Sequence, residues 1–281
     1  MRKLLVILMI IPLLTFTVIG QVEEKSNNEG EKVQVLENGE INWTKLKIKA
    51  VGIGVPNPDL SPQGQRALVK RAAKQAAFRN LLEITQGVHV SSETTVENFM
   101  LKDDVIKSKV DGILRGYKVE DVKYMSDSTI EVVVSIIIKG ELAKAMLPLY
   151  KRNREDMTMP QIGDKAKADT DYTGLIIDAT DLEVLPCMAP KVYSENKKIV
   201  YDAAYVDSEY AIQNGVVGYA KDVSMAKNNE RVLDNPLVVK AVKAADNKRD
   251  IYISKKDAEL ITNNEKLIED VKKCKVMFII N

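Results

Sequence analysis

The residue types that most often perform catalysis are scarce in this chain of 281 residues. His89 is the only histidine, so one chain cannot build a three-histidine zinc site. A serine–histidine–acid triad would have to use His89, with Ser91 and Glu93 as neighbours on the same expected strand face. Side chains two apart on a strand project in parallel and do not form such a relay. We therefore predict no catalytic residue and interpret His89 as a partly exposed strand residue.

Glycines and clustered carboxylates give only weak signals for a bound cofactor or metal. Gly52-Ile53-Gly54 stands between an expected strand and an expected helix, as a dinucleotide loop does, but Asn57 occupies the position of the third glycine. We interpret the two glycines as a tight strand exit. The acidic residues Asp103-Asp104 and those between Asp178 and Glu183 lack the spacing of a calcium loop. The sequence predicts no cofactor and no metal.

Cationic side chains gather on one expected helix, where adjacent and four-residue spacings place them on a shared face. The four candidate partner-binding residues are Arg66, Lys70, Arg71 and Lys74. Such a face can contact a phospholipid headgroup or an acidic protein, or it can be the solvated side of an amphipathic helix. The net charge of the chain is only +1, which argues against generic nucleic-acid binding because that needs a basic excess.

The N-terminal residues indicate the cellular compartment in which the protein is expected to act. Arg2 and Lys3 precede an apolar run from Leu4 to Ile19, and the small Gly20 stands before a cut ahead of Gln21. The run is shorter than the roughly 20 residues of a membrane span. We predict a cleaved signal peptide and export to the periplasm or cell envelope. A retained N-terminal anchor is the alternative.

Cys187 and Cys274 are the only two cysteines. In an oxidising compartment they could form one disulfide. Two separate half-buried thiols are the alternative, because spacing alone does not fix the geometry of a disulfide. Neither cysteine follows the expected signal cleavage site, so neither is placed for N-terminal acylation.

Hydrophobic periodicity predicts strands and helices in two groups. In the first half, strands are expected at 45–55, 88–96, 117–123 and 129–138, and helices at 62–84, 99–110 and 141–150. In the second half, strands are expected at 173–179, 198–203, 216–220, 237–244, 250–253 and 275–280, with a helix opening at Ser254 and another at 265–273. Both faces of 129–138 are apolar, which favours a strand covered on both sides.

These elements predict an α+β protein with two small α/β domains, each a mostly antiparallel sheet packed by helices. The expected boundaries are a signal peptide at 1–20, a flexible tether at 21–42, a first domain at 43–150, a linker at 151–171 and a C-terminal domain at 172–281.

Several segments of the first half resemble one bacterial envelope family. They are Gly52-Ile53-Gly54-Val55-Pro56, Lys70-Arg71-Ala72-Ala73, residues 76–83, Gly87-Val88, residues 112–117 and the Val-rich residues 132–138. Residues 44–140 resemble the lipoprotein-20-like domain, which is similar to the N-terminal domain of the flagellar assembly protein T. The resemblance implies a small α/β module with a secreted, non-enzymatic envelope role, often membrane-associated or flagellar. Family members are often lipoproteins, whereas this chain lacks the acylated cysteine.

We therefore predict an exported, non-enzymatic envelope protein that acts through protein contacts in flagellar or outer-membrane assembly. Its expected partners are envelope or flagellar proteins, and a peripheral membrane association is also open. The alternative is a periplasmic binding module for a small ligand or cell-wall fragment, with a pocket near Tyr193, Tyr201 and Tyr205.

Overall fold

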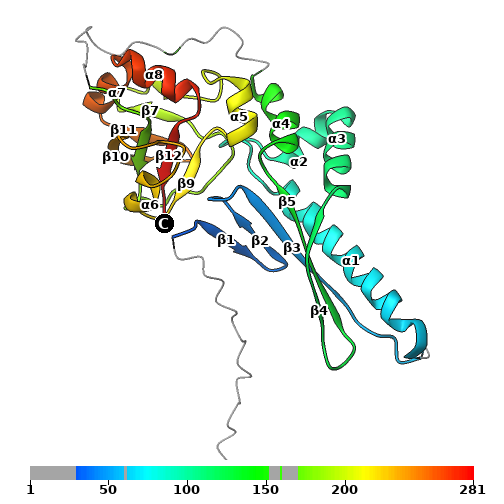
Figure 1. Cartoon of the computed structure of the whole chain (residues 1–281). Helices are drawn as coiled ribbons and strands as arrows, with labels where there is room; N and C mark the ends of the chain where they lie inside the picture. Colours follow the sequence, from blue (N-terminus) through cyan, green and yellow to red (C-terminus); the bar gives the residue numbers. More distant parts are fainter. Residues whose placement is uncertain (1–29, 60–61, 152–158, 160–169) are drawn as a thin grey trace, which may run out of the picture.

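The computed structural model describes residues 30–59, 62–151, 159 and 170–281, which form two sheets with their helices (Figure 1). The expected α+β architecture of two sheet-containing domains is confirmed. The expected signal peptide, the start of the expected tether and most of the expected linker lie outside the described residues. No helix formed by the described residues is both long and apolar enough to cross a membrane.

The first sheet is antiparallel throughout and has the strand order β1-β2-β3-β5-β4. Its strands are β1 Val33–Leu36, β2 Gly39–Asn42, β3 Lys47–Gly54, β4 Lys118–Tyr124 and β5 Ile130–Ile137. The helices of this domain are α1 Pro62–Gln86, α2 Val96–Lys102, α3 Asp104–Arg115 and α4 Glu141–Lys151. The long helix α1 runs along β3 and β5, as Figure 1 shows.

Small residues bring α1 unusually close to β3. Ala73 and Ala77 are fully buried in α1. A Cβ atom on Gly52 would lie 2.0 Å from the backbone nitrogen of Ala77, and one on Gly54 would lie 2.2 Å from the carbonyl oxygen of Val69. The backbones of helix and strand are therefore in contact. This contact, and not the expected tight strand exit, is why the sequence needs glycine at 52 and 54.

The described part of the expected flexible tether is ordered as the β1–β2 hairpin, so that expectation was wrong for residues 33–42. Ile41 is buried where β2 pairs with β3. Trp43, which is only 2% exposed, follows the hairpin directly and donates its ring N–H to Gln34 Oε1 at 3.2 Å. Ile41 and Trp43 anchor an otherwise polar segment. The burial of these large apolar side chains offsets the conformational entropy that the segment loses when it becomes ordered.

The expected strand at 88–96 does not form; it is a loop with one isolated bridge between His89 and Thr95. Its backbone instead accepts hydrogen bonds from the second domain. Met188 N donates to His89 O at 2.9 Å, and Ala189 N donates to Val90 O at 2.8 Å. The alternation in the sequence thus reflects burial against another domain and not a strand of the first sheet.

The single helix expected at 99–110 is also wrong, because the chain forms α2 and α3 there. Asp103 separates them with extended backbone, and its carboxylate accepts hydrogen bonds from Val105 N at 2.8 Å and Ile106 N at 3.3 Å. An aspartate that caps a new helix in this way ends the preceding one.

Only one face of β5 is covered by helices, contrary to the expected two. Val132 and Val134 are fully buried, whereas Val133 is half-buried and Ile137 is 45% exposed. Ion pairs flank these apolar residues on the open face, including Lys47–Glu120 at 2.8 Å. The charged neighbours keep this open sheet face solvated.

Glu120 is expected to make the stability of the first domain depend on pH. Hydrogen bonds from Lys47 Nζ at 2.8 Å and Ser135 Oγ at 2.7 Å lower the pKa of its carboxyl group to about 2. The folded pKa lies below the unfolded value of about 4.3. The resulting stabilisation is therefore fully present above the unfolded pKa and is lost as the pH falls through the folded pKa.

For Glu120→Gln we expect a loss of about 1 kcal/mol in unfolding free energy at neutral pH, the size measured for partly exposed pairs. The unfolding free energy of the variant should also change less steeply with pH than that of the wild type between about pH 5 and pH 2. Urea denaturation at a series of pH values measures both. Glu131→Gln is the control, because Glu131 lies 3.6 Å from Lys123 on the same face. Equal slopes in the wild type and Glu120→Gln would contradict the assignment.

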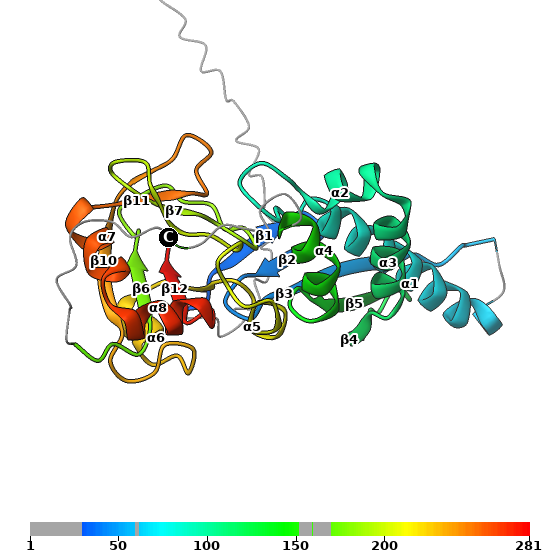
Figure 2. The same cartoon turned by 90° about the horizontal axis from the view of Figure 1, so that it is seen from above.

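The second sheet has seven strands in the order β8-β7-β11-β10-β6-β12-β9. Its strands are β6 Leu175–Asp178, β7 Val192–Ser194, β8 Ile199–Tyr201, β9 Gly218–Ala220, β10 Leu237–Ala244, β11 Ile251–Ile253 and β12 Val276–Ile279. Its helices are α5 Ser208–Asn214, α6 Val223–Lys227, α7 Lys255–Thr262 and α8 Glu265–Lys272. Figure 2 shows this domain beside the first, with β6 and β12 in its interior.

Four of the six pairings in the second sheet are parallel, so the expected mostly antiparallel sheet is wrong for this domain. Strand β12 follows the helices α7 and α8, and such crossovers allow parallel pairing. All four residues of β12 are buried, which is typical of a parallel strand covered on both faces. A short apolar run in the sequence does not indicate whether the strand pairs in a parallel or an antiparallel way with its neighbours.

The two cysteines do not form the disulfide considered above. Both are buried, and each makes its own set of hydrogen bonds in a different part of the second domain. Cys187 N donates to the Tyr219 hydroxyl at 3.1 Å, and burial raises the pKa of its thiol well above the ordinary value. Cys274 lies just before β12, where its carbonyl accepts a hydrogen bond from Arg231. The structure has two separate thiols, and both are fully buried and not half-buried.

One hydrophobic core crosses from the first domain into the second. The Trp43 ring meets the Tyr219 ring edge-on, with centroids 5.8 Å apart, and Tyr219 meets Phe278 in the same way at 6.0 Å. Polar contacts surround this aromatic seam: Thr44 Oγ1 donates to Tyr219 O at 2.8 Å, and Gly140 N donates to Ile212 O at 2.7 Å. The domains therefore share a packed interface.

Candidate contact surface

The four cationic residues predicted from the sequence lie on the first half of α1, and Tyr124 of the edge strand β4 contacts two of them. Near the start of the helix, the Arg66 guanidinium lies 4.2 Å from the centroid of the Tyr124 ring at the end of β4. Lys70 Nζ donates to the Tyr124 hydroxyl at 3.3 Å. This hydrogen bond lowers the pKa of the Tyr124 phenol, and the charges of Lys70 and Arg66 lower it further.

The other two cations, Arg71 and Lys74, line an open groove of 340 Å³. The remaining residues of this groove are Gln75, Phe78, Arg115 and Tyr117. Arg115 was missed by the sequence analysis, because it ends α3 and joins the group only through tertiary packing. We call Arg66, Lys70, Arg71, Lys74 and Arg115 the basic strip.

Aromatic and apolar side chains accompany the basic strip. Phe78 and Tyr117 lie with ring centroids 6.1 Å apart in the groove. A second hollow of 500 Å³ lies between the start of α1 and the β4–β5 turn, and Arg66, Tyr124 and Met125 line it. Met125 is 44% exposed. The second hollow is also lined by the polar side chains of Gln65, Asp127, Ser128 and Thr129. The surface therefore offers cations together with hollows of mixed apolar and polar lining for the side chains of a partner.

None of the five cations forms an ion pair with a carboxylate among the residues that the structure describes. Guanidinium and ammonium groups that have no carboxylate partner can form charge-assisted hydrogen bonds with the carboxylates of another molecule. The chemistry available here is recognition of an anionic group beside apolar side chains.

The residues considered for a catalytic triad do not assemble into one. The Nδ1 atom of His89 lies 3.3 Å from the backbone carbonyl oxygen of Ser91. The Ser91 hydroxyl instead accepts a hydrogen bond from Glu93 N at 3.3 Å. Burial lowers the pKa of His89, and the charge of Arg249 lowers it further. Within the described ranges, no three histidine, cysteine, aspartate or glutamate side chains are grouped to hold a metal.

Two of the three tyrosines considered for a ligand pocket, Tyr193 and Tyr201, have other roles in the structure. Tyr201 is fully buried, and its hydroxyl donates to Val216 O at 2.6 Å. Tyr193 stacks on Tyr252 of the neighbouring strand, with centroids 5.3 Å apart. Tyr201 therefore belongs to the core and Tyr193 to a cross-strand pair, so they do not present a joint binding surface.

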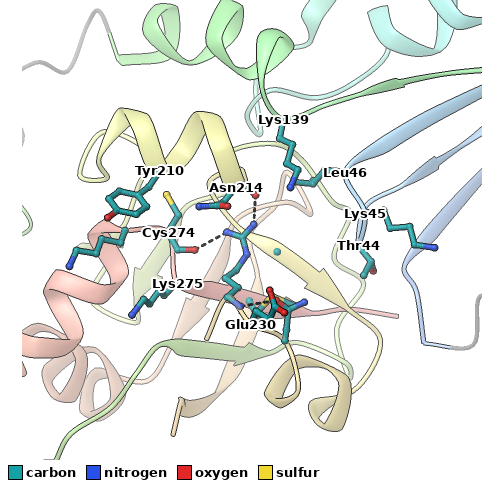
Figure 3. Close-up of a pocket in the computed structure, with 14 residues that line it drawn as sticks. Thr44, Lys45, Leu46, Lys139, Tyr210, Asn214, Glu230, Cys274 and Lys275 are labelled. Carbon is teal, nitrogen blue, oxygen red and sulfur yellow. Dashed lines mark hydrogen bonds between the residues drawn. The ribbon is translucent and has the colours of Figure 1, made fainter. Parts of the chain in front are cut away.

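A polar cleft of 420 Å³ lies elsewhere, where the two domains meet (Figure 3). It is lined by the β2–β3 connection, by Lys139 after β5 and by several segments of the second domain. No single stretch of sequence contains this site, so periodicity and spacing could not indicate it.

Two family models match separate parts of the chain. Residues 45–136 match the model of the LPP20 lipoprotein, and residues 174–281 match the model of the second domain of Treponema pallidum Tp0624. No curated protein matches the chain. The first match confirms the lipoprotein-20-like resemblance and indicates a cell-envelope protein, and the basic strip lies entirely within it.

Proposed function

We propose that this LPP20-like envelope protein is exported and acts without catalysis, by binding an acidic protein partner at the basic strip. In this proposal it serves the assembly of an envelope structure, such as the flagellum or the outer membrane. The observation that carries the proposal is a row of cations without carboxylate partners among the described residues, placed beside exposed aromatic and apolar side chains. The lipoprotein family match supports the envelope location.

The shape of the surface favours a protein over a flat lipid layer. The groove beside Phe78 and Tyr117 and the hollow beside Tyr124 are concave and can receive individual side chains. A partner segment with alternating acidic and apolar residues could place carboxylates on the basic strip and apolar groups in the hollows. Arginine suits this role, because its planar fork matches a carboxylate and stacks on aromatic rings.

Reversing the charge of the strip should abolish partner binding while the fold is retained. We expect Lys70→Glu, Arg71→Glu and Lys74→Glu together to weaken binding by at least tenfold, since each lost charge-assisted contact contributes about 1.5–3 kcal/mol. A photo-crosslinking amino acid in place of Gln75, which lines the groove, reports binding in intact cells. Adducts should disappear in the triple variant, and the crosslinked partner peptide should be rich in Asp and Glu.

The control variant carries the same change in charge on the second domain, at exposed lysines outside the strip. It combines Lys198→Glu, Lys227→Glu and Lys256→Glu, and it should keep the adducts. Circular dichroism checks that both variants are folded. Adducts that persist in the strip variant would contradict the proposal. So would crosslinks to lipid together with sedimentation on phosphatidylglycerol vesicles, which would assign the strip to a membrane surface.

A further inference from the structure

The cleft between the domains is rich in cationic side chains. Its lining residues are Thr44, Lys45, Leu46, Lys139, Tyr210, Asn214, Gly218, Asn229, Glu230, Arg231, Lys273, Cys274, Lys275 and Met277. Five of these are lysine or arginine, and Glu230 is the only carboxylate among them. The chain as a whole is nearly neutral, so this is a local concentration of positive charge.

Two of the cleft cations are neutralised by neighbours outside it. Lys45 Nζ lies 2.6 Å from Glu31, and Lys275 Nζ lies 2.6 Å from Asp270. The other three cations, Lys139, Lys273 and Arg231, have no ion pair with a carboxylate of the described residues. The cleft therefore keeps an excess of positive charge even after its salt bridges are counted.

Arg231 holds the second-domain side of the cleft together through backbone carbonyls. Its Nη1 donates to Gly215 O at 3.0 Å and to Cys274 O at 2.7 Å, and its Nη2 donates to Asn214 O. These carbonyls belong to the end of α5 and the approach to β12, and a cation is favourable at a helix C-terminus. Carbonyl dipoles carry no net charge, so these hydrogen bonds do not neutralise the guanidinium.

We infer that the cleft binds a small soluble anion carrying phosphate or carboxylate groups, and that Lys139 of the first domain and Lys273 of the second, which both line the cleft, contribute to its affinity. In Figure 3, Lys139 reaches from the first domain toward the side chains of the second. A volume of 420 Å³ falls in the range of small-molecule sites. An anion there would meet an excess of positive charge and contact both domains. This site is independent of the basic strip.

Calorimetric titration of the full chain tests the inference, with pyrophosphate and citrate as probes and sodium chloride at matched ionic strength as the salt control. We expect saturable binding of at least one probe, and binding at least tenfold weaker in the double variant Lys139→Gln and Lys273→Gln. Neither lysine is buried, so this variant should stay folded. The matched control is Lys198→Gln with Lys227→Gln, which removes the same charge elsewhere and should bind as the wild type does.

The two probes identify the anionic group, since preference for pyrophosphate indicates phosphate and preference for citrate indicates carboxylate. The bound probe should also raise the melting temperature of the wild type and not that of the cleft variant, because it links the two domains. Binding no stronger than the chloride control would overturn the inference. Equal weakening in the cleft variant and in the control variant would also overturn it, because it would indicate a general effect of charge.

Discussion

Replacing Gly52 with alanine should unfold the first domain or destabilise it by about 3 kcal/mol or more, at the upper end of the range for overpacked cores. The added Cβ would lie 2.0 Å from the backbone nitrogen of Ala77 and 2.3 Å from the carbonyl oxygen of Ala73. Both clashing atoms belong to the backbone of α1, so no side-chain rotation can relieve the contact. The helix would have to move away from β3, and the buried residues between helix and sheet would lose their packing.

Gly112→Ala provides a sharp control. Gly112 lies inside α3, and a Cβ built on it meets no atom within 4 Å. Alanine there should stabilise the domain by about 0.5–1 kcal/mol, because glycine is the poorer helix former. Urea denaturation followed by circular dichroism measures both variants. Similar stability of Gly52→Ala and the wild type would show that α1 and β3 are not in backbone contact in solution.

The elements that the sequence predicted well are those with long and consistent hydrophobic periods. Helix α1, with its alanine-rich stripe, and the β4–β5 hairpin formed as expected, and so did the helix capped by Ser254, whose hydroxyl accepts a hydrogen bond from Asp257 N. The short elements β7 and α5 were missed, although the equally short β8, β9 and β11 fall within expected strands, so the length of an element alone does not decide whether its pattern is visible. Strand direction in the second sheet was missed as well, since it depends on the crossovers and not on the strand residues.

The candidate sites also differ in whether their residues come from one element or are brought together by the fold. The cations on α1 share one helix face, so their spacing alone indicated a common surface. Arg115 and Tyr124 join that surface from α3 and β4, and only the packed fold brings them there. The cleft combines Lys139 with Arg231 from the other domain, a pairing that no local pattern contains. Sequence reasoning finds surfaces made by one element and misses those made by several.

Trp43→Ala is expected to uncouple the two domains. The tryptophan is buried between the first sheet and Tyr219 of the second domain, in a core that is continuous across both. Truncating it should reduce the unfolding free energy by about 3–5 kcal/mol, the range for large aromatic side chains in cores. Because the lost volume lies at the seam, the shared core would be interrupted there. The wild type should therefore unfold in one calorimetric transition and the variant in two.

Trp43→Phe separates the loss of packing from the loss of the indole itself. Phenylalanine keeps an aromatic ring that can face Tyr219 edge-on but removes the hydrogen bond to Gln34. It should lower the melting temperature slightly and preserve a single transition. Scanning calorimetry distinguishes the cases. Two transitions already present in the wild type would mean that the domains unfold independently despite their contact. A single shifted transition in Trp43→Ala would mean that the remaining contacts between the domains, including the hydrogen bonds from Thr44, Gly140, Met188 and Ala189, suffice to couple them.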